Sequence, residues 1–435
     1  MRSLFLIVLL GSVMAHGSGY EKAILWGAKY SGVAGVGSPG VKGSDSVFYN
    51  PAGLVNSSEF GEFVFNLSQS SSTAKGPVVP TLAPGPGATV FTNAEKQETA
   101  TNAGSLIPGV TYSMKLSDSL AFGLGYYAVG GTRAKYEDVD FAPRNFKAKV
   151  GSEISITEFA AGVGYKVNEA FRLGMSLRYT MTEAAFSAVS YRLVQSPNIY
   201  GIVNLDIKDV KYAALDSVRL GAQYDVSESL KLGLMIRTET AVDGKAKASG
   251  RLNTPASTSS IAEVDAKVKT VLPMAVGLGA EFKLSDTWNL FGEYVMTQYS
   301  KIDKVVVDGT ITLGSNNSEI TDIEQKWKDQ HQLKLAGEYS GISWPVRFGY
   351  IWTSQVSNSD YARASFTPPG AAATYTLGTG QEFKVGENPL ELNLAVDYTT
   401  VSGSSSDTPA SSLASPKGTY EVTALGIHTG LVYKF

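Results

Sequence analysis

The chain has 435 residues, with 40 acidic and 37 basic side chains and no cysteine. The absence of cysteine excludes thiol catalysis, thiolate metal sites and disulfide bonds. The balanced charge provides no basic face, so we expect no nucleic-acid partner. Length alone allows two or three domains, although a single all-β domain can also be this long.

Residues 1–15 predict a secretory signal peptide. Arg2 precedes the compact apolar run LFLIVLLGSVMA, and Val13 and Ala15 are the small residues expected before a cleavage site. The run is too short to cross a bilayer comfortably, and no longer uninterrupted apolar segment follows it. We therefore predict cleavage after Ala15 and export of the remaining chain, which would cross a membrane only as strands.

Residues 16–57 lack the alternating pattern of the later segments. They contain the small, flexible stretch YSGVAGVGSPGVKGSDS and then SVFYNPAGLV, in which Asn50, Pro51 and Gly53 suit positions one, two and four of a type I turn. GVGSPG formally matches a dinucleotide-binding fingerprint, but no strand precedes it, so we reject that interpretation. The segment is neither charged enough nor simple enough to be a disordered tail.

From residue 58 onward, short turns alternate with long polar segments. Each short turn places Ser, Asn, Gly or Pro between two runs of alternating residues, which is a hairpin signal. Six such turns lie within 115–126, 166–177, 225–236, 283–294, 339–350 and 384–398. The polar segments are seven, at about 70–104, 131–150, 191–205, 244–260, 301–323, 356–376 and 403–417. Fourteen strands with tight turns at one end and long loops at the other are typical of an outer-membrane barrel.

The strands alternate between a wholly apolar face and a polar or glycine face, as in FRLGMSLRYTM at 171–181. A soluble sandwich also alternates, but with strands of about 5–6 residues. Stretches such as 151–167 and 206–226 exceed the roughly 9–11 residues that a tilted membrane strand needs. The final strand ends on Phe435 and resembles the C-terminal signature that outer-membrane assembly machinery recognises. We therefore predict an all-β transmembrane barrel of fourteen antiparallel strands in the bacterial outer membrane.

A barrel of fourteen strands has a lumen too wide for its own side chains to fill, because about eight strands are the limit for that. An open lumen would make a general porin. Residues 16–57 would fill this lumen if they lay inside the barrel. We therefore predict a plug, or hatch, over 16–57 and a barrel domain over 58–435.

The stretch VKGSDSVFYNPAGLV resembles the N-terminal hatch signature of the FadL-type family, outer-membrane transporters of long-chain fatty acids and aromatic hydrocarbons. The signal peptide, the fourteen strands and the C-terminal aromatic match that family as well, so the resemblance covers essentially the whole chain. It implies a helical hatch, with Asn50, Pro51 and Ala52 at the positions of the family motif. We expect this corner to hold Val47 and Phe48 against the lumen wall.

The stretch AFGLGYYAVGGTRAKY, residues 121–136, is similar to the family's third strand, whose inward kink opens the barrel wall sideways. Many members carry Pro-Phe-Gly there, where this chain has Val129, Gly130 and Gly131. Paired glycines can also bend a strand and interrupt its pairing. The resemblance therefore implies a ligand pocket and a lateral gap beside these three residues. The outer segments 191–205 and 244–260 do not read as amphipathic helices, so the ligand can differ from a long-chain fatty acid.

The resemblance implies passive uptake of hydrophobic compounds, whether fatty acids, alkanes or aromatics. Outer loops would catch the ligand, the hatch region would hold it, and a gap at strand 3 would release it into lipid, which is downhill for an apolar molecule. We expect a monomer surrounded by outer-membrane lipids, with no cofactor and no metal. His331 and His428 stand isolated, so we predict no catalytic residue and no enzyme. Two alternatives stay open, a non-specific polar porin and a structural or adhesion barrel.

Overall fold

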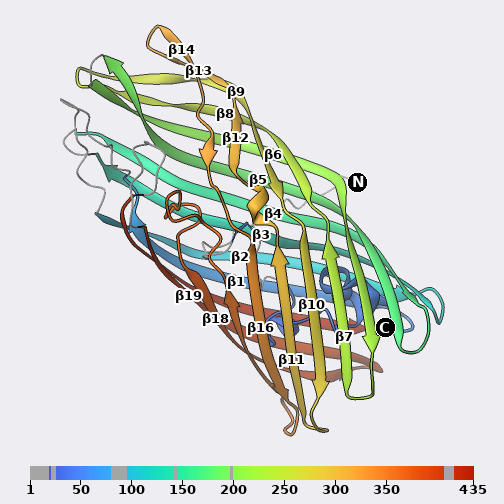
Figure 1. The fold of residues 1–435 in the computed structure, drawn as a ribbon. Helices are drawn as coiled ribbons and strands as arrows, with labels where there is room; N and C mark the ends of the chain where they lie inside the picture. The colour runs from blue at the N-terminus through green and yellow to red at the C-terminus, as the bar shows by residue number, and fades with distance from the viewer. Residues whose placement is uncertain (1–18, 21–25, 80–95, 142–144, 196–198, 406–415) are drawn as a thin grey trace.

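The computed structural model describes residues 19–20, 26–79, 96–141, 145–195, 199–405 and 416–435. The predicted signal peptide and its cleavage point lie outside these residues. The described chain forms a closed antiparallel β-barrel with short helices inside it (Figure 1). No helix within the described ranges is long and apolar enough to cross a membrane.

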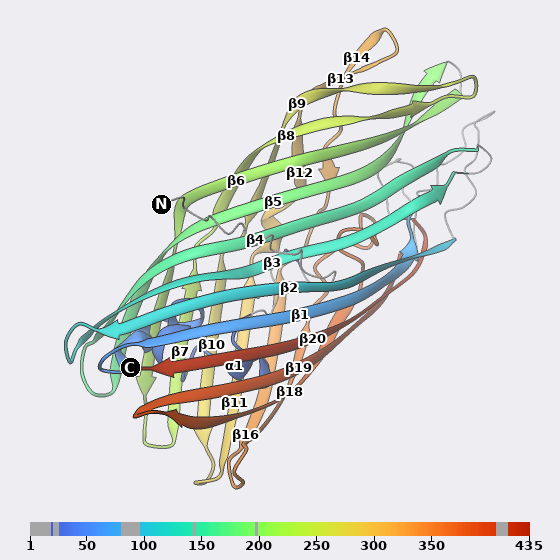
Figure 2. The ribbon, with the colours of Figure 1, turned by 180° about the vertical axis from the view of Figure 1, so that it is seen from behind.

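Fourteen strands form the wall, each paired with the next along the chain, and the last closes on the first (Figure 2). The continuous strands are β1 (Glu62–Pro77), β2 (Gln97–Lys115), β3 (Leu120–Asp140), β4 (Lys147–Lys166), β5 (Phe171–Gln195), β6 (Ile199–Asp225), β17 (Val346–Thr353), β18 (Ala371–Val385), β19 (Asn388–Ser405) and β20 (Gly418–Lys434). The broken strands are β7 (Leu230–Arg237) with β8 (Thr240–Asn253), β9 (Thr258–Leu272) with β10 (Ala275–Lys283), β11 (Trp288–Thr297) with β12 (Lys304–Asp308), and β15 (Ile323–Glu324) with β16 (Gln330–Tyr339). An extra hairpin, β13 (Thr310–Leu313) and β14 (Asn316–Glu319), extends one outer loop. The predicted fold is confirmed.

The wall exposes apolar side chains on its outer face and buries polar ones on its inner face, which is the reverse of a soluble protein. On β5, Leu173, Met175 and Leu177 are exposed on the outer face, whereas the lumen-facing Arg178 is fully buried. Large apolar side chains are exposed on most other strands of the wall as well. An apolar exterior of this extent is stable against lipid and not against water, so the barrel spans a membrane.

Several segments predicted as loops are strands, and that part of the prediction was wrong. The expected loop at 131–150 contains the end of β3 and the start of β4, and the expected loop at 244–260 is largely β8 and β9. Alternate residues of these extensions, such as Ala246 and Val268, are buried in an apolar cluster, while their neighbours are exposed and polar. Beyond the lipid, the outer face of a strand meets water, so a polar composition there does not indicate a loop.

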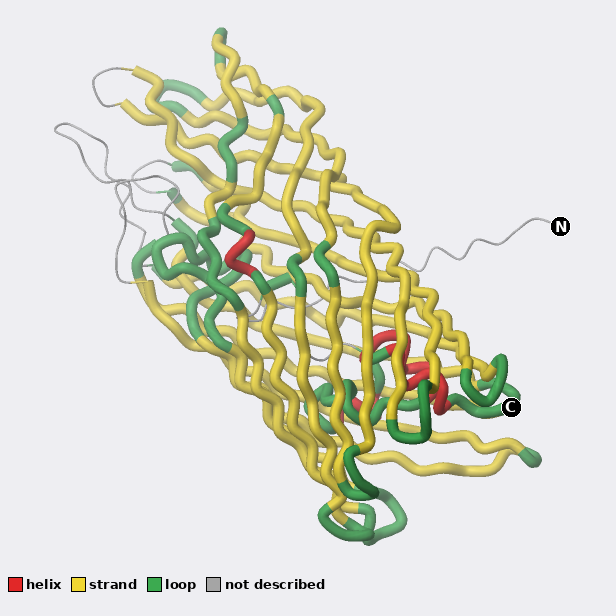
Figure 3. The backbone as a smooth tube through the Cα atoms, turned by 45° about the vertical axis from the view of Figure 1, so that its right-hand side comes forward, coloured by secondary structure: helices red, strands yellow, loops and turns green. Residues whose placement is uncertain are grey.

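The hatch consists of short helices inside the end of the barrel that carries the short turns (Figure 3). They are α1 (Ala28–Gly32), α2 (Ser46–Tyr49) and the 3-10 helices η1 (Gly43–Asp45) and η2 (Pro51–Asn56). Pro51 starts η2 because its fixed φ suits the first helical position. The Asn50 side chain caps the helix by accepting a hydrogen bond from the backbone N–H of Ala52 at 3.1 Å. The Asn-Pro-Ala motif is therefore the start of a helix.

The hatch rests on glycines of the wall. Gly174 on β5 and Gly221 on β6 lie so close to the chain at Asn50, Pro51 and Ala52 that a Cβ atom at either glycine would overlap hatch atoms. Further glycines that approach the hatch in this way are Gly164, Gly233 and Gly279. The glycine face of the strands therefore provides the space in which the hatch sits.

Candidate functional site

Asn50 ties the hatch to the wall. Its Nδ2 lies 2.8 Å from the carbonyl oxygen of Ser38 in the hatch, 3.0 Å from that of Ala222 on β6 and 3.2 Å from that of Leu234 on β7. Asn50 is fully buried, so these contacts supply the bonds that water would otherwise make. A side-chain amide combines a donor group and an acceptor, which lets one residue cap η2 and hold two wall strands.

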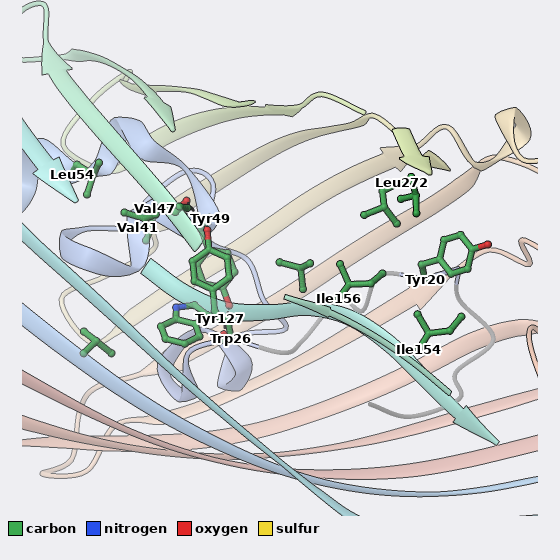
Figure 4. Packing of buried hydrophobic residues seen from close by; sticks show 14 of the residues in the cluster. Tyr20, Trp26, Val41, Val47, Tyr49, Leu54, Tyr127, Ile154, Ile156 and Leu272 are labelled. Carbon is green, nitrogen blue, oxygen red and sulfur yellow. Dashed lines mark hydrogen bonds between the residues drawn. The ribbon is translucent and has the colours of Figure 1, made fainter. Parts of the chain in front are cut away.

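Val47 and Phe48 of α2 lie against β3. Val47 is fully buried, and the Phe48 ring meets the ring of Tyr127 edge to face at a centroid distance of 5.0 Å. The ring of Trp26 lies 5.5 Å from the same tyrosine, within the apolar cluster shown in Figure 4. The structure thus places the predicted hatch corner against Tyr127 on the third strand. Tyr127 lies two residues before Val129.

A buried ionic network joins this corner to the wall. Glu158 on β4 accepts a hydrogen bond from Nε of Arg178 on β5 at 3.0 Å, and Nη2 of Arg219 on β6 lies 3.5 Å from its other oxygen. Arg219 also donates through Nη1 to the carbonyl of Val47 at 3.0 Å and to the hydroxyl of Tyr127 at 3.1 Å. The three charged side chains are almost completely buried. One network therefore connects the hatch with β3, β4, β5 and β6.

The wall is interrupted between β2 and β3. The two strands pair as far as Val110 and Tyr126, and no ladder bond joins them beyond that rung in the described residues. Farther out, the side-chain amide of Asn102 on β2 donates to the carbonyl of Arg133 on β3. Between these two points β2 remains paired with β1, and β3 with β4, so the interruption is confined to one seam of the barrel.

Val129, Gly130 and Gly131 lie at this interruption. The register between β3 and β4 shifts between Ala128 and Gly130, so Val129 is an extra residue in the strand. Gly131 has φ of 150°, a conformation that side chains disfavour. Its N–H faces no partner on β2 and donates to the carbonyl of Tyr20 at 2.8 Å. The structure therefore places these three residues and Tyr20 together at the break.

Tyr20 is a residue of this site that the sequence reasoning missed. It is buried, and its ring lies 6.4 Å from that of Tyr299, 5.0 Å from that of Trp327 and 5.8 Å from that of Phe366, measured between centroids. These partners lie roughly 280 to 350 positions further along the chain, so no local pattern marks them. Only closure of the barrel brings them together.

Two apolar cavities connect the outer loops with Tyr20. The outer cavity has a volume of ≈ 110 Å³ and is lined by the outer parts of β5 and β6, by the β13 strand and residues 320–323, and by segment 363–366. Most of its lining is apolar, and Asp322 and Arg363 are its charged members. The inner cavity, of ≈ 40 Å³, is lined by Tyr20 and by mostly apolar side chains of β4, β5, β6, β8, β9 and β12. Phe186, Ile323 and Phe366 border both cavities, which makes them neighbours.

A third cavity, of ≈ 570 Å³, lies against the hatch and is polar. Its charged lining residues are Lys29, Lys42, Asp45, Glu62, Glu281, Glu338, Arg347, Glu391 and Lys434. Charged walls hold water, and an apolar molecule gains nothing by moving into a hydrated space. This cavity is therefore unsuited to an apolar ligand.

Asp45 gives the hatch a pH dependence. Trp26 donates through Nε1 to its carboxylate at 2.8 Å. Burial, and then the neighbouring charge of Glu62, raises the pKa of Asp45 to about 7, while Lys29 and Glu391 act in opposite directions. The folded carboxyl group keeps its proton up to about pH 7, whereas the unfolded group loses it near its ordinary pKa of 3.8. The hatch is therefore most stable below about pH 4 and loses stability as the pH rises to about 7.

Asp45→Asn is expected to remove this loss, because asparagine keeps an acceptor for Trp26 and carries no proton to lose. Hydrogen exchange of the peptide that contains residues 26–45, corrected for intrinsic rates, should show protection that falls between about pH 4 and pH 7 in the natural chain and falls less in the variant. Asp286→Asn, at an exposed turn, serves as the control. Equal losses of protection in all three chains would assign the pH dependence to another group.

The expectation that His428 stands isolated was wrong. Its Nδ1 lies 2.7 Å from Oγ of Ser68 on β1, and its Nε2 lies 2.8 Å from the carboxylate of Asp397 on β19. All three residues are buried, and none borders the three cavities described above. The chain of bonds links three wall strands and presents no accessible nucleophile. No group of His, Asp and Glu able to hold a metal ion occurs in the described part of the chain.

Residues 23–435 match the model of a family described as outer membrane protein transport protein (OMPP1/FadL/TodX). A putative outer membrane protein of Neisseria meningitidis serogroup B is 24% identical, over 99% of this chain and 98% of its own length. A solved Pseudomonas aeruginosa FadL homologue has a TM-score of 0.74 at 16% identity and covers 96% of this chain and 100% of its own. The Pseudomonas putida toluene transporter TodX has a TM-score of 0.70 at 14% identity, over 95% of this chain and 98% of its own.

At these identities the solved structures establish the fold alone. The family match covers nearly the entire chain, and the chain shares the barrel fold of the solved relatives. The chain therefore belongs to the FadL/TodX family of bacterial outer-membrane transport proteins, whose members are channels and not enzymes.

Proposed function

We propose that the protein is a passive channel for hydrophobic compounds, which outer loops capture, the hatch region holds and a gap at strand 3 releases sideways into lipid. One observation carries this proposal. The edge of β3 beside Gly131 is unpaired with β2, and Leu106 on the facing part of β2 is exposed on the lipid side. A gap in the wall at this depth would lead from the lumen to lipid.

The two apolar cavities support the capture and holding steps. The outer cavity lies among the outer loops, where a ligand would arrive first, and shares three apolar side chains with the inner one. The aromatic rings around Tyr20 offer flat apolar surfaces to an alkyl chain or an aromatic ring. Since two of the similar solved structures are named as a FadL homologue and a toluene transporter, both fatty acids and monoaromatic hydrocarbons are candidate ligands.

Tyr20 would act as the gate between the inner cavity and the opening. It lines the cavity, and its carbonyl accepts the hydrogen bond of Gly131 at the edge of β3. Displacement of Tyr20 would free that edge and connect the two spaces. The alternative route, through the charged cavity against the hatch, would carry an apolar molecule into water. Release into the bilayer needs no energy source, because lipid is the better solvent.

Uptake of a labelled panel tests this function. We expect lipid vesicles that contain the full chain to take up monoaromatics, alkanes or long-chain fatty acids, and to show no large steady ion current. A general porin would instead pass a steady, salt-dependent current. A structural or adhesion barrel would take up no member of the panel.

Gly131→Trp tests lateral release. The bulky side chain would fill the opening, and the initial uptake rate should fall roughly tenfold, equivalent to about 1.4 kcal/mol in the barrier. Gly292→Trp is the control, because an added Cβ there meets no atom closer than 3.7 Å. Both variants are first checked for barrel assembly by their shift in electrophoretic mobility on heating.

A reversible cross-link keeps the test decisive if Gly131→Trp fails to assemble. The chain lacks cysteine, so Asn102→Cys with Arg133→Cys can tie β2 to β3 without side reactions. Oxidation should slow uptake and reduction should restore it. The pair Thr73→Cys and Thr423→Cys, which face each other across the paired strands β1 and β20, should have no effect. Normal uptake with β2 and β3 cross-linked and with an assembled Gly131→Trp barrel would reject lateral release at strand 3.

A further inference from the structure

Three lysines form a row across adjacent strands on the outer surface of the barrel. Lys211 on β6 lies directly opposite Lys245 on β8, and Lys245 lies directly opposite Lys267 on β9. All three side chains are exposed. Directly opposite residues in antiparallel strands have Cβ atoms about 4.5–5.5 Å apart, and like charges in such positions destabilise the sheet. We call Lys211, Lys245 and Lys267 the lysine row.

The lysine row is not neutralised by the protein. None of its members has a carboxylate within 4.0 Å among the described residues, although neighbouring lysines do. Lys247 bonds Asp265 at 2.6 Å, and Lys269 bonds Asp308 at 2.5 Å. The carboxylates nearest the lysine row are Glu183 opposite Lys211, Asp308 opposite Lys267, and Asp209, Asp243 and Asp265 on the same strands, of which Asp265 is engaged by Lys247. Asp308 is already engaged by Lys269, and none of the other carboxylates lies within 4.0 Å of the row, so the three ammonium groups face one another without an ion pair.

The basic side chains beside the β2–β3 interruption, in contrast, form ion pairs. Arg133 and Lys135 on β3 both lie within ion-pair distance of Glu153 on β4. Lys149 is likewise 3.3 Å from Glu137. Lys211, Lys245 and Lys267 differ from these side chains in having no ion pair, and their strands β6, β8 and β9 lie side by side in the outer half of the barrel (Figures 1 and 2).

The lysine row lies just outside the apolar band. On β6 the band ends at Leu215, which is 61% exposed and is paired with Tyr179 on β5. Lys211 is four residues farther toward the long loops, about 13 Å along the strand. With a strand tilt of about 45°, this is roughly 9 Å above the edge of the hydrocarbon, which is the depth of lipid head groups. The long loops mark this side as the outer leaflet.

We propose that the lysine row binds the phosphate groups of lipopolysaccharide, the phosphorylated glycolipid of the outer leaflet. Basic clusters next to a bilayer attract anionic head groups, and a phosphate oxygen accepts charge-assisted bonds from ammonium groups. A phosphate between the three ammonium groups would remove the repulsion that their direct opposition creates. The acyl chains of the same lipid would lie on the exposed apolar side chains below, at Leu215 and Tyr179. The combination of charge and adjoining apolar surface favours a lipid phosphate over free phosphate.

Native mass spectrometry of the purified full chain, with added bisphosphorylated lipid A as the probe, tests this proposal. The variant Lys211→Gln/Lys245→Gln/Lys267→Gln should retain roughly one tenth of the bound lipid. The matched control removes three lysines at the short-turn end, Lys115→Gln/Lys283→Gln/Lys384→Gln, and should bind as the natural chain does. Replacement of the lysine row by arginine should preserve binding, because the charge is kept.

Two further binding measurements identify the ligand. Dephosphorylated lipid A should bind as weakly to the natural chain as lipid A binds to the glutamine variant. Inorganic phosphate at the lipid concentration should not displace lipid A, because it lacks the acyl chains. Equal binding of phosphorylated and dephosphorylated lipid, or unchanged binding by the assembled glutamine variant, would overturn the proposal. Displacement by equimolar phosphate would assign the row to free anions instead of a lipid.

Discussion

Gly174→Leu is expected to turn an electrically silent barrel into a conducting pore. The Cβ direction of Gly174 points at the backbone of Pro51 and Ala52, so any side chain there must displace η2. Displacement would also break the bonds that Asn50 makes to β6 and β7. A lumen of fourteen strands is too wide to be closed by wall side chains, so its current depends on the hatch. Planar-bilayer recordings should show a large steady current from this variant and none from the natural chain.

Two further variants test whether displacement of the hatch opens the pore. Gly174→Ala should give an intermediate or flickering current, because one methyl group already overlaps the hatch. Gly277→Ala is the control, since its nearest wall atoms, on Met235 and Val295, lie 3.5 Å from the added Cβ and can accept it. If Gly174→Leu assembles as a barrel and remains as silent as the natural chain, the hatch is not what closes the lumen.

Glu158→Leu is expected to lower the free energy of unfolding by about 3–5 kcal/mol. The change removes the carboxylate that Arg178 and Arg219 share, so two buried guanidinium groups lose an anionic partner. Breaking a buried ion pair costs more than the pair itself contributes, because the remaining charge stays out of water. Unfolding by urea in lipid vesicles, followed by tryptophan fluorescence, measures the loss.

The exposed pair of Lys283 and Asp286 provides the comparison. Asp286→Leu removes an ion pair of similar length at a solvated turn and should leave the unfolding midpoint where it is. The Glu158 change should also weaken the hatch contact, because Arg219 holds the carbonyl of Val47. Equal stability of the Glu158 variant and the natural chain would mean that the network is solvated and does not hold the hatch.

Much of the barrel could be predicted because membrane strands carry their pattern locally. The apolar alternation at 171–181 marks the outer face of β5, and the short turn before Phe171 marks the end of β4. The same local reasoning was wrong for 131–150 and 244–260, where strands continue beyond the lipid with a polar outer face. Composition distinguishes lipid from water as the neighbour of a strand, but it does not show where the strand ends.

The candidate site, like the fold, could be predicted from the sequence only in part. The Asn-Pro-Ala motif and the paired glycines could be identified from the sequence, because a helix start and a flexible strand position depend on neighbouring residues. The partners of these residues could not. Asn50 donates to the carbonyl of Ala222 on β6, and Gly131 donates to that of Tyr20, and no local pattern marks either contact.

The sequence by itself therefore determined the fold class, the number of wall strands and the family resemblance. Each of these follows from periodicity, turn chemistry or a short motif, which are properties of neighbouring residues. Only the tertiary structure decided where the wall is unpaired, which residue occupies that edge, and which charges are neutralised on each face. Those features depend on the register of strands that meet after long separations along the chain, and register is set by the closure of the whole barrel.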